Sequence, residues 1–321
     1  AISGPGAATL AALGVILIPA MIEREKFSDP FAHGVVAAAS SIAVIIPPSI
    51  SFVIYASLTG VSVGDIFVAG ILPGVIMGAA MILVVQIYAH KHHLKPAHPW
   101  KGWREVWRTF KSAFWGLLMP VIILGGIYSG LFTPTEAGAA SIVYALFLAA
   151  VYREMNFKQF LMAIKESVLS TSQILVIVAA ANCFGYILTI EQVPQAITAF
   201  LVSVIHNKYV FLLAVNIFLL IVGMFMEGIA AMLILIPLLA PVAAAFGIDA
   251  IQMGMIVVFN LSIGTLTPPL GTVMFVTCGV TKCPTKDFLK ECIPFYIYQL
   301  IILLMISYIP AVSLGLVNLI Y

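Results

Sequence analysis

The fold of this chain is decided by one stretch, Asn260-Leu261-Ser262-Ile263-Gly264-Thr265-Leu266-Thr267-Pro268-Pro269-Leu270-Gly271-Thr272. It places two adjacent prolines inside an apolar run from 251 to 280. Proline has no backbone N–H and interrupts the hydrogen-bond ladder of a helix. The run from 33 to 58 holds a second such stretch, Ala39-Ser40-Ser41-Ile42-Ala43-Val44-Ile45-Ile46-Pro47-Pro48-Ser49. The sequence therefore predicts two helices that are each broken in the middle.

The composition indicates that lipid is the main solvent. The 321 residues are 62% hydrophobic and 9% charged, with a mean hydropathy of +1.14. Soluble domains are about 45–50% apolar and about 25% charged, and a membrane-spanning helix needs about 20 mostly apolar residues. We expect spans at 33–58, 66–89, 113–131, 137–152, 168–190 and 293–316, interrupted tracts at 209–246 and 251–280, and a short tract at 1–21. The predicted fold class is an all-α polytopic membrane protein.

The basic residues predict the topology. Every Lys and Arg except Lys208 lies in one of four clusters, at 24–26, 91–111, 153–165 and 282–290. Cytoplasmic loops carry the excess of Lys and Arg, so all four clusters are assigned to the cytoplasm. The number of crossings then balances only if the tract 209–246 enters and leaves on one side. This tract is predicted to be a re-entrant hairpin that turns near Glu227-Gly228, and 1–21 to be the returning half of a similar hairpin.

An internal repeat relates the two broken helices. Ser41-Ile42 and Pro47-Pro48 recur 221 residues later as Ser262-Ile263 and Pro268-Pro269. Further matches are Ile16-Leu17-Ile18-Pro19 with Ile234-Leu235-Ile236-Pro237, Phe67 with Phe288, and Pro73 with Pro294. The topology makes the two repeats inverted. Inverted repeats with discontinuous helices point to a binding site near the bilayer midplane in secondary transporters.

The chemistry of the breaks favours sodium. Unpaired carbonyls in hydrocarbon cost several kcal/mol each, and a desolvated sodium ion, a hard cation, would satisfy them. The turn of each hairpin also exposes a helix N-terminus, which favours anions. No Lys or Arg lies inside a predicted span. An anionic substrate would therefore depend on helix dipoles and hydroxyl groups.

The remaining segments are predicted as connectors. Residues 99–112 hold Trp100, Trp103 and Trp107 among basic residues, which suits a helix in the headgroup layer. Residues 156–170 have a similar amphipathic pattern. The expected organisation is 1–90 as part of the first repeat, 91–112 as a cytoplasmic amphipathic connector, 113–208 as scaffold-type helices and a second connector, and 209–321 as the second repeat.

Four segments of the sequence resemble the large membrane subunit of TRAP (tripartite ATP-independent periplasmic) transporters. They are Ser3-Gly4-Pro5-Gly6-Ala7-Ala8, where the family more often has Ser at Pro5, Ile45-Ile46-Pro47-Pro48-Ser49 followed by Tyr55, Gly130-Leu131-Phe132-Thr133-Pro134-Thr135-Glu136-Ala137, and 260–271. The resemblance covers the whole chain. Family members have further N-terminal residues that hold scaffold helices and the first half of the first hairpin. The chain itself begins without Met, and we expect that an N-terminal part is absent.

The resemblance implies an elevator-type, sodium-coupled importer in the bacterial inner membrane. Its substrate would be an organic acid anion such as a dicarboxylate, a sialic acid or a sugar or keto acid. A periplasmic binding protein would deliver the substrate, and a small four-helix membrane subunit would join the large one. Sodium ions are the only cofactor expected, and no nucleic acid is expected as a partner.

The expected site residues lie at the breaks and the hairpin tips. The resemblance implies one sodium site at Gly228, Gly264, Thr267 and Leu270, and the repeat shift places the other at Ala43, Ile46 and Ser49, with Ser3 from the hairpin. Most would act through backbone carbonyls. The residues expected to bind substrate are Ser3, Gly4, Gly6, Ser40, Ser41, Glu227, Asn260 and Thr265.

Several alternatives stay open. The chain could be an ion channel, or a sodium-coupled anion transporter that works without a binding protein. A non-transporting assembly subunit or an intramembrane enzyme is a third class, although the sequence contains no catalytic motif and no nucleotide-binding loop. Glu136 suits a helix capping box or a proton relay, and Glu227 suits an ion- or substrate-linked carboxylate or a hydrogen-bonded turn residue.

Overall fold

The structure, a computed structural model, describes residues 6–23, 25–94, 102–153, 155–281 and 284–320. All regular secondary structure in these residues is helical. The helices are α1 Gly6–Glu23, α2 Asp29–Ile45, α3 Ile50–Thr59, α4 Val63–Lys91, α5 Trp103–Tyr128, α6 Pro134–Tyr152, α7 Phe157–Ile190, α8 Val193–Val204, α9 Lys208–Phe225, α10 Gly228–Ala245, α11 Ala250–Gly264, α12 Thr272–Thr281, α13 Thr285–Tyr308 and α14 Pro310–Ile320. Within the described part of the chain, eight helical segments are long and apolar enough to cross a membrane. These findings confirm the predicted all-α polytopic class.

The chain forms two compact units. Residues Ala1–His98 and Thr189–Tyr321 form the first, which we name the core unit, and Pro99–Leu188 form the second. The core unit holds both proline breaks. The candidate functional site therefore lies in the core unit.

Local capping defines the first broken helix. The helix α2 ends at Ile45, and α3 begins at Ile50, where the Ser49 side chain accepts a hydrogen bond from the Phe52 amide. The helix α3 ends at Gly60, whose φ of 77° is a left-handed conformation that glycine adopts without steric cost. The first break therefore lies between the capped C-terminus of α2 and the capped N-terminus of α3.

The second broken helix follows the same plan. The Asp249 side chain caps α11, which ends at Gly264, and α12 begins at Thr272. Upstream, α9 and α10 are separated only by Met226 and Glu227. The predicted interruption of the tract 209–246 near Glu227-Gly228 is confirmed.

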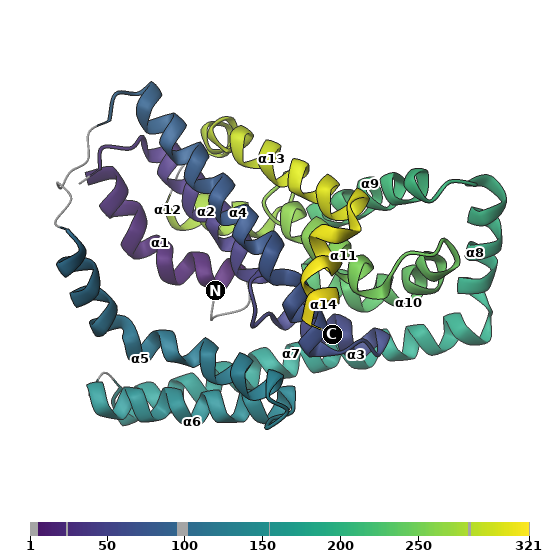
Figure 1. The fold of residues 1–321 in the computed structure, drawn as a ribbon, viewed down its shortest axis with the longest axis horizontal. Coiled ribbons are helices and arrows are strands. Elements are labelled where there is room, and N and C mark those ends of the chain that lie inside the picture. The colour runs from purple at the N-terminus through teal and green to yellow at the C-terminus, as the bar shows by residue number, and fades with distance from the viewer. Residues whose placement is uncertain (1–5, 24, 95–101, 154, 282–283, 321) are drawn as a thin grey trace. The chain divides into compact units, whose positions relative to one another are not determined.

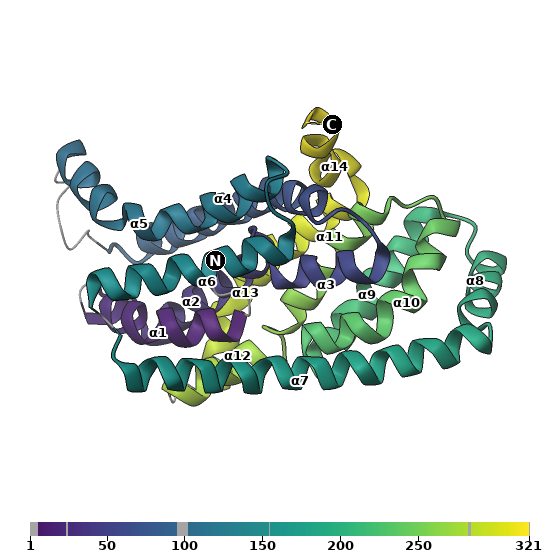
Figure 2. The same cartoon turned by 90° about the horizontal axis from the view of Figure 1, so that it is seen from below.

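The two repeats have matching neighbours (Figures 1 and 2). The helix α1 contacts α12, and α10 contacts α3, so the helix before each broken helix packs on the second half of the other broken helix. Likewise, α2 contacts α13, and α11 contacts α4. The peptide bond between the two prolines is cis in both breaks. The internal repeat read from the sequence is thus also a repeat of tertiary contacts.

The second unit consists of α5, α6 and most of α7. The helices α5 and α6 pack together, and the Tyr144 hydroxyl donates to the Trp115 carbonyl over 2.7 Å. The helix α6 begins with a capping box in which the Thr133 side chain accepts from the Glu136 amide and the Glu136 carboxylate accepts from the Thr133 amide. The structural reading of Glu136 is therefore confirmed.

The structure differs from the predicted elements in four segments. The predicted span 293–316 is two helices, α13 and α14, because Pro310 lacks the N–H that would continue the ladder. The amphipathic segments at 99–112 and 156–170 are not separate helices in their described residues, since α5 and α7 run on into the following spans. The helix α8, with Pro194 in its first turn, was not predicted.

Candidate functional site: a cavity between the two proline breaks

A cavity of about 350 Å³ lies in the core unit between the two broken helices and the start of α10. We name it the inter-repeat cavity. Its walls come from α2 and α3, from α11 and α12, and from the residues around the α9–α10 turn. The lining residues are Ser41, Val44, Ile50, Ser51, Glu227, Gly228, Ile229, Met232, Val258, Leu261, Ser262, Thr265, Thr272 and Val273. Residues that are more than 200 positions apart in the sequence therefore line the same cavity.

Residues at equivalent repeat positions line this cavity in pairs. The shift of 221 relates Ser41 to Ser262, Val44 to Thr265, and Ser51 to Thr272, and all six line the cavity. The Ser262 hydroxyl donates to the Ser41 carbonyl over 3.3 Å. Equivalent residues touch only where a pseudo-symmetry axis passes between them, so the cavity lies beside that axis.

Gln299 of α13 supports this contact. Its Nε2 donates to the Ser41 hydroxyl over 2.9 Å, and its side chain is fully buried. The Ser41 hydroxyl in turn donates to the Ala38 carbonyl over 2.7 Å. These bonds fix the orientation of Ser41, because its hydroxyl both accepts from Gln299 and donates to Ala38. The other end of the Gln299 amide, Oε1, is buried without a hydrogen-bond partner.

Backbone carbonyls are left available at the second break. Tyr296 donates its hydroxyl to the Leu266 carbonyl over 2.7 Å, and the Thr267 hydroxyl donates to the Ile263 carbonyl over 2.9 Å. Among the described residues, no hydrogen bond reaches the carbonyl oxygens of Thr267, Pro268 and Pro269. Carbonyl oxygens of this kind suit a hard cation.

The first break has the same arrangement. The Ser49 hydroxyl donates to the Val44 carbonyl over 2.5 Å. No described group donates to the carbonyls of Ile46, Pro47 and Pro48, which are equivalent to those left available at the second break. The residues present at both breaks could therefore hold a sodium ion through backbone oxygens.

The turn between α9 and α10 lies against the second break. The Glu227 carboxylate accepts from the Ala230 amide over 3.0 Å and caps α10. The Leu270 amide donates to the Met224 carbonyl over 3.2 Å, which ties the break to the end of α9. Of the residues expected at one sodium site, Leu270 is thus tied to the end of α9, and Gly228 is the first residue of α10.

A close helix crossing fixes α9 on α11. A Cβ on Gly264 would lie 2.5 Å from the Cα of Gly223, and one on Gly223 would lie 3.0 Å from the Cα of Gly264. Only glycine at both positions permits this approach, because such distances are well inside van der Waals contact. Gly264 therefore has a packing role, beside any role of its carbonyl.

Other predicted residues lie apart from the cavity. Ser40 is buried, and its hydroxyl donates to the Ala37 carbonyl over 2.7 Å. Asn260 directs its Nδ2 to Asn216 Oδ1 over 2.8 Å and to the Ile256 carbonyl over 2.7 Å, so it faces α9. Neither residue lines the inter-repeat cavity.

Of the remaining predicted residues, Ala43 is buried on α2, and Gly6 is the first residue of α1. Ser3 and Gly4 lie outside the described residues. Ser51 and Thr272 were missed, although both are hydroxyl residues that follow a break at the same repeat shift. That shared position was the signal that would have identified them.

The electrostatics of the cavity are unusual for an anion site. Among the lining residues that the structure describes, Glu227 is the one charged side chain, and there is no Lys, Arg or His. Any anion bound there would rely on hydroxyl groups, on amides at helix N-termini, or on a cation bound with it.

Comparisons with known proteins identify the class. The eight candidate spans make the chain a multi-pass membrane protein, and its relatives are named as transporter permeases. Residues 1–312 match the family described as "Tripartite ATP-independent periplasmic transporter, DctM component". The chain belongs to this family, whose members are large permease subunits of the inner membrane.

Three relatives show how far the similarity extends. The chain is 44% identical over 319 residues to the C4-dicarboxylate TRAP transporter large permease protein of Pseudomonas aeruginosa, covering 99% of this chain and 74% of that protein. It is 37% identical over 313 residues to the sialic acid TRAP transporter large permease protein of Vibrio cholerae, covering 97% and 73%. It is 37% identical over 310 residues to the 2,3-diketo-L-gulonate TRAP transporter large permease protein of Escherichia coli, covering 96% and 72%.

Proposed function

We propose that this chain forms the transport core of a sodium-coupled importer for a small organic anion. The observation that carries the proposal is the inter-repeat cavity, which equivalent residues of the two proline breaks line in pairs. In transporters with inverted repeats, one repeat moves against the other, so that the site opens first to one side of the membrane and then to the other. A site lined by both repeats is in contact with the parts that move. The substrate class follows the relatives, which are named for a C4-dicarboxylate, a sialic acid and 2,3-diketo-L-gulonate.

Sodium supplies the positive charge that the cavity lacks. An anionic substrate beside Glu227 would be repelled, and no basic side chain among the described lining residues offsets this repulsion. The carbonyls left available at both breaks, those of 46–48 and 267–269, offer oxygen ligands close to the cavity. Sodium at these positions would neutralise the negative charge, so substrate and sodium would bind together.

The mechanism that we propose is an elevator movement of the repeat core. In it, the α9–α10 pair acts as one re-entrant hairpin and 1–21 as the returning half of the other, and each hairpin tip closes over one face of the site. A periplasmic binding protein delivers the substrate, and a small four-helix membrane subunit completes the complex. The family description as one component of a tripartite system supports these partners.

The test is uptake by the full-length permease with its small subunit in proteoliposomes. We expect uptake of the substrate only when an inward sodium gradient and the substrate-loaded binding protein are both present. Uptake without the binding protein would favour a transporter of another type, and uptake that follows the substrate gradient alone would favour a channel. Either result would overturn the proposal.

A further inference from the structure

A surface groove of about 550 Å³ lies at the start of α5, in the second unit. We name it the α5 groove. Its lining residues, all from the first three turns of this helix, are Arg104, Glu105, Trp107, Arg108 and Lys111. The inter-repeat cavity lies in the core unit, so the α5 groove is not part of that candidate site.

The basic side chains of the groove share one face of α5. Arg104, Arg108 and Lys111 are spaced by four and three residues, and residues at this spacing are neighbours on a helix surface. All three are exposed. The Glu105 carboxylate lies 2.6 Å from the Arg108 guanidinium, whereas no ion pair within the described residues involves Arg104 or Lys111. Three cations and one carboxylate give the lining a net charge of +2.

An aromatic row runs beside the basic face. Trp107, Phe110 and Phe114 are spaced by three and four residues, and all three side chains are exposed. The Trp107 and Phe110 rings stack with centroids 5.6 Å apart, and Phe110 meets Phe114 edge to face at 6.2 Å. Since Trp107 also lines the groove, the apolar row borders the basic face directly. The start of α5 thus offers a ligand both positive charge and an apolar surface.

The length of α5 places the groove at the membrane surface. No charged residue lies between Ser112 and Tyr128, where the helix ends. At 1.5 Å per residue this stretch is roughly 25 Å long, close to the thickness of a hydrocarbon core, about 30 Å. The turns before Ser112 therefore lie at the level of the lipid headgroups. They belong to a basic cluster that the charge pattern assigns to the cytoplasmic side.

The helix α6 has an aromatic residue at the same level. The Tyr144 hydroxyl donates to the Trp115 carbonyl, and the short loop 129–133 makes α6 antiparallel to α5. Eight residues from this bond, toward the same end of the pair, lie Trp107 in α5 and Tyr152 in α6. Both side chains are exposed. Trp and Tyr are enriched at the membrane–water interface, so α6 supports the level inferred for the groove.

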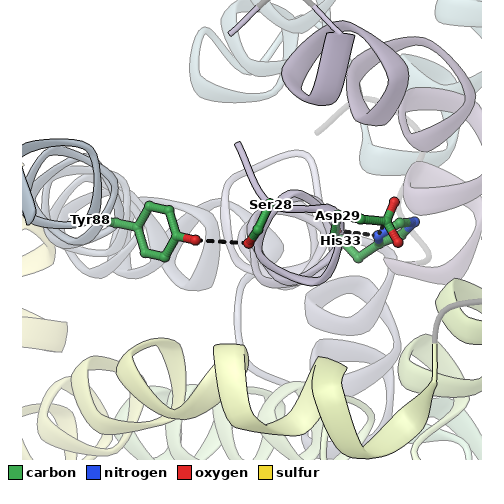
Figure 3. A network of polar contacts seen from close by, with 4 residues as sticks. All are labelled: Ser28, Asp29, His33 and Tyr88. Atoms are coloured by element: carbon green, nitrogen blue, oxygen red, sulfur yellow. Dashed lines mark hydrogen bonds and ion pairs between the residues drawn. The ribbon is translucent and has the colours of Figure 1, made fainter. Parts of the chain in front are cut away.

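In the core unit, the aromatic residue before the same basic cluster has partners inside the protein. Tyr88, near the end of α4, hydrogen-bonds to Ser28 through its hydroxyl over 2.8 Å (Figure 3). Its ring stacks on Phe31 with centroids 3.4 Å apart. Beside Ser28, Asp29 has a carboxylate oxygen 3.6 Å from His33 Nδ1 (Figure 3). The aromatic row of α5 instead faces outward, where a lipid can cover it.

From these observations we propose that the α5 groove binds an anionic phospholipid with two phosphates, a diphosphatidylglycerol. The two phosphates match the net charge of +2, and they take the cations of Arg104 and Lys111, with Arg108 between them. Guanidinium groups bind phosphate oxygens strongly, and basic clusters at the cytoplasmic end of membrane helices are typical of such lipid recognition. The acyl chains pack along the aromatic row from Trp107 to Phe114. Such a lipid would hold the start of α5 at the membrane surface.

The test is native mass spectrometry of the delipidated full-length permease with its small subunit, titrated with lipids of the same acyl chains. We expect diphosphatidylglycerol to bind at least tenfold more tightly than phosphatidylglycerol, and phosphatidylethanolamine to bind more weakly than both. Excess inorganic pyrophosphate should not displace the lipid, because it has no acyl chains for the aromatic row. Equal affinities for the two anionic lipids, or displacement by pyrophosphate, would overturn the proposal.

A double variant locates the lipid. Arg104→Gln with Lys111→Gln removes two cations and leaves the ion pair of Arg108 and Glu105 intact. Each Lys or Arg near a lipid surface strengthens binding by roughly fivefold, so diphosphatidylglycerol should bind roughly thirtyfold more weakly. Lys165→Gln is the control, since it removes an exposed cation of the same unit outside the groove, and it should bind within about twofold of the wild type. If the double variant does not fold, Arg104→Gln alone should lose roughly fivefold. Unchanged affinity in the folded variant, or an equal loss in the control, would contradict the assignment.

Discussion

The Ser262 hydroxyl donates a hydrogen bond to the carbonyl of Ser41, the residue 221 positions earlier that occupies the same place in the other repeat. The two broken helices are thus in direct contact at equivalent positions. The contact lies in the wall of the inter-repeat cavity. The cavity is accordingly a product of both repeats, and changes in either break should affect it.

Ser41→Ala should destabilise the permease more than Ser262→Ala. Removing the Ser41 hydroxyl leaves Gln299 Nε2 buried without an acceptor, which costs about 1–3 kcal/mol. Removing the Ser262 hydroxyl loses one bond of 3.3 Å and should cost less than about 1 kcal/mol. The thermal unfolding midpoints of the two purified variants show which substitution destabilises the permease more. A Ser262→Ala variant with the lower midpoint would contradict this account of the contact.

Gly264→Ala should separate α9 from α11. The added Cβ would lie 2.5 Å from the Gly223 backbone, and overpacking of this kind costs about 1–3 kcal/mol. We expect a lower unfolding temperature and a higher sodium concentration for half-maximal uptake, because the break moves with α11. Gly315→Ala is the control, since a Cβ there meets nothing within 4 Å. Equal unfolding temperatures and equal sodium requirements in the two variants would show that α9 and α11 do not cross closely.

Glu136→Gln should leave transport unchanged at every pH. The carboxylate caps α6 by accepting from the Thr133 amide, and glutamine serves the same position of a capping box. Thr133→Ala, which removes the N-cap side chain, should instead lower stability by about 0.5–2 kcal/mol. Uptake measured across a pH series checks the first variant and thermal unfolding the second. A shifted pH profile in Glu136→Gln would restore the proton-relay reading.

Tyr296→Phe should raise the sodium requirement of uptake. The Tyr296 hydroxyl holds the Leu266 carbonyl at 2.7 Å, directly before the carbonyls available at the second break. Without that bond the backbone of 266–269 loses a fixed orientation. We expect a several-fold increase in the sodium concentration for half-maximal uptake, with little change in substrate affinity at saturating sodium. An unchanged sodium curve would show that Tyr296 does not position the break.

The architecture around the breaks could be predicted from the sequence because prolines and helix caps act locally. The sequence alone indicates where the helices are interrupted at Pro47-Pro48, at Pro268-Pro269 and at the turn near Glu227, without knowledge of tertiary contacts. A single proline is a weaker signal, because α13 ends at Tyr308 just before Pro310 but continues through Pro294. The continuity of α5 and α7 was missed, since charge density marks the membrane surface but does not interrupt a helix.

The site was only partly predictable, because a cavity depends on which helix faces pack together. Ser41, Glu227, Gly228 and Thr265 were expected and do line the inter-repeat cavity. Asn260 and Ser40 have similar chemistry, but they face other partners. Likewise, nothing in the sequence around His33 indicates that its Nε2 is buried without a partner. Such facts follow from three-dimensional packing.

The central claim is that the second break holds a coupling sodium ion, and the sodium dependence of uptake in Thr267 variants tests it most directly. Thr267→Ser keeps the hydroxyl that donates to the Ile263 carbonyl and should retain the wild-type sodium curve. Thr267→Leu adds bulk beside the available carbonyls and should raise the sodium concentration for half-maximal uptake at least tenfold. A wild-type sodium curve in a folded Thr267→Leu variant would contradict the claim.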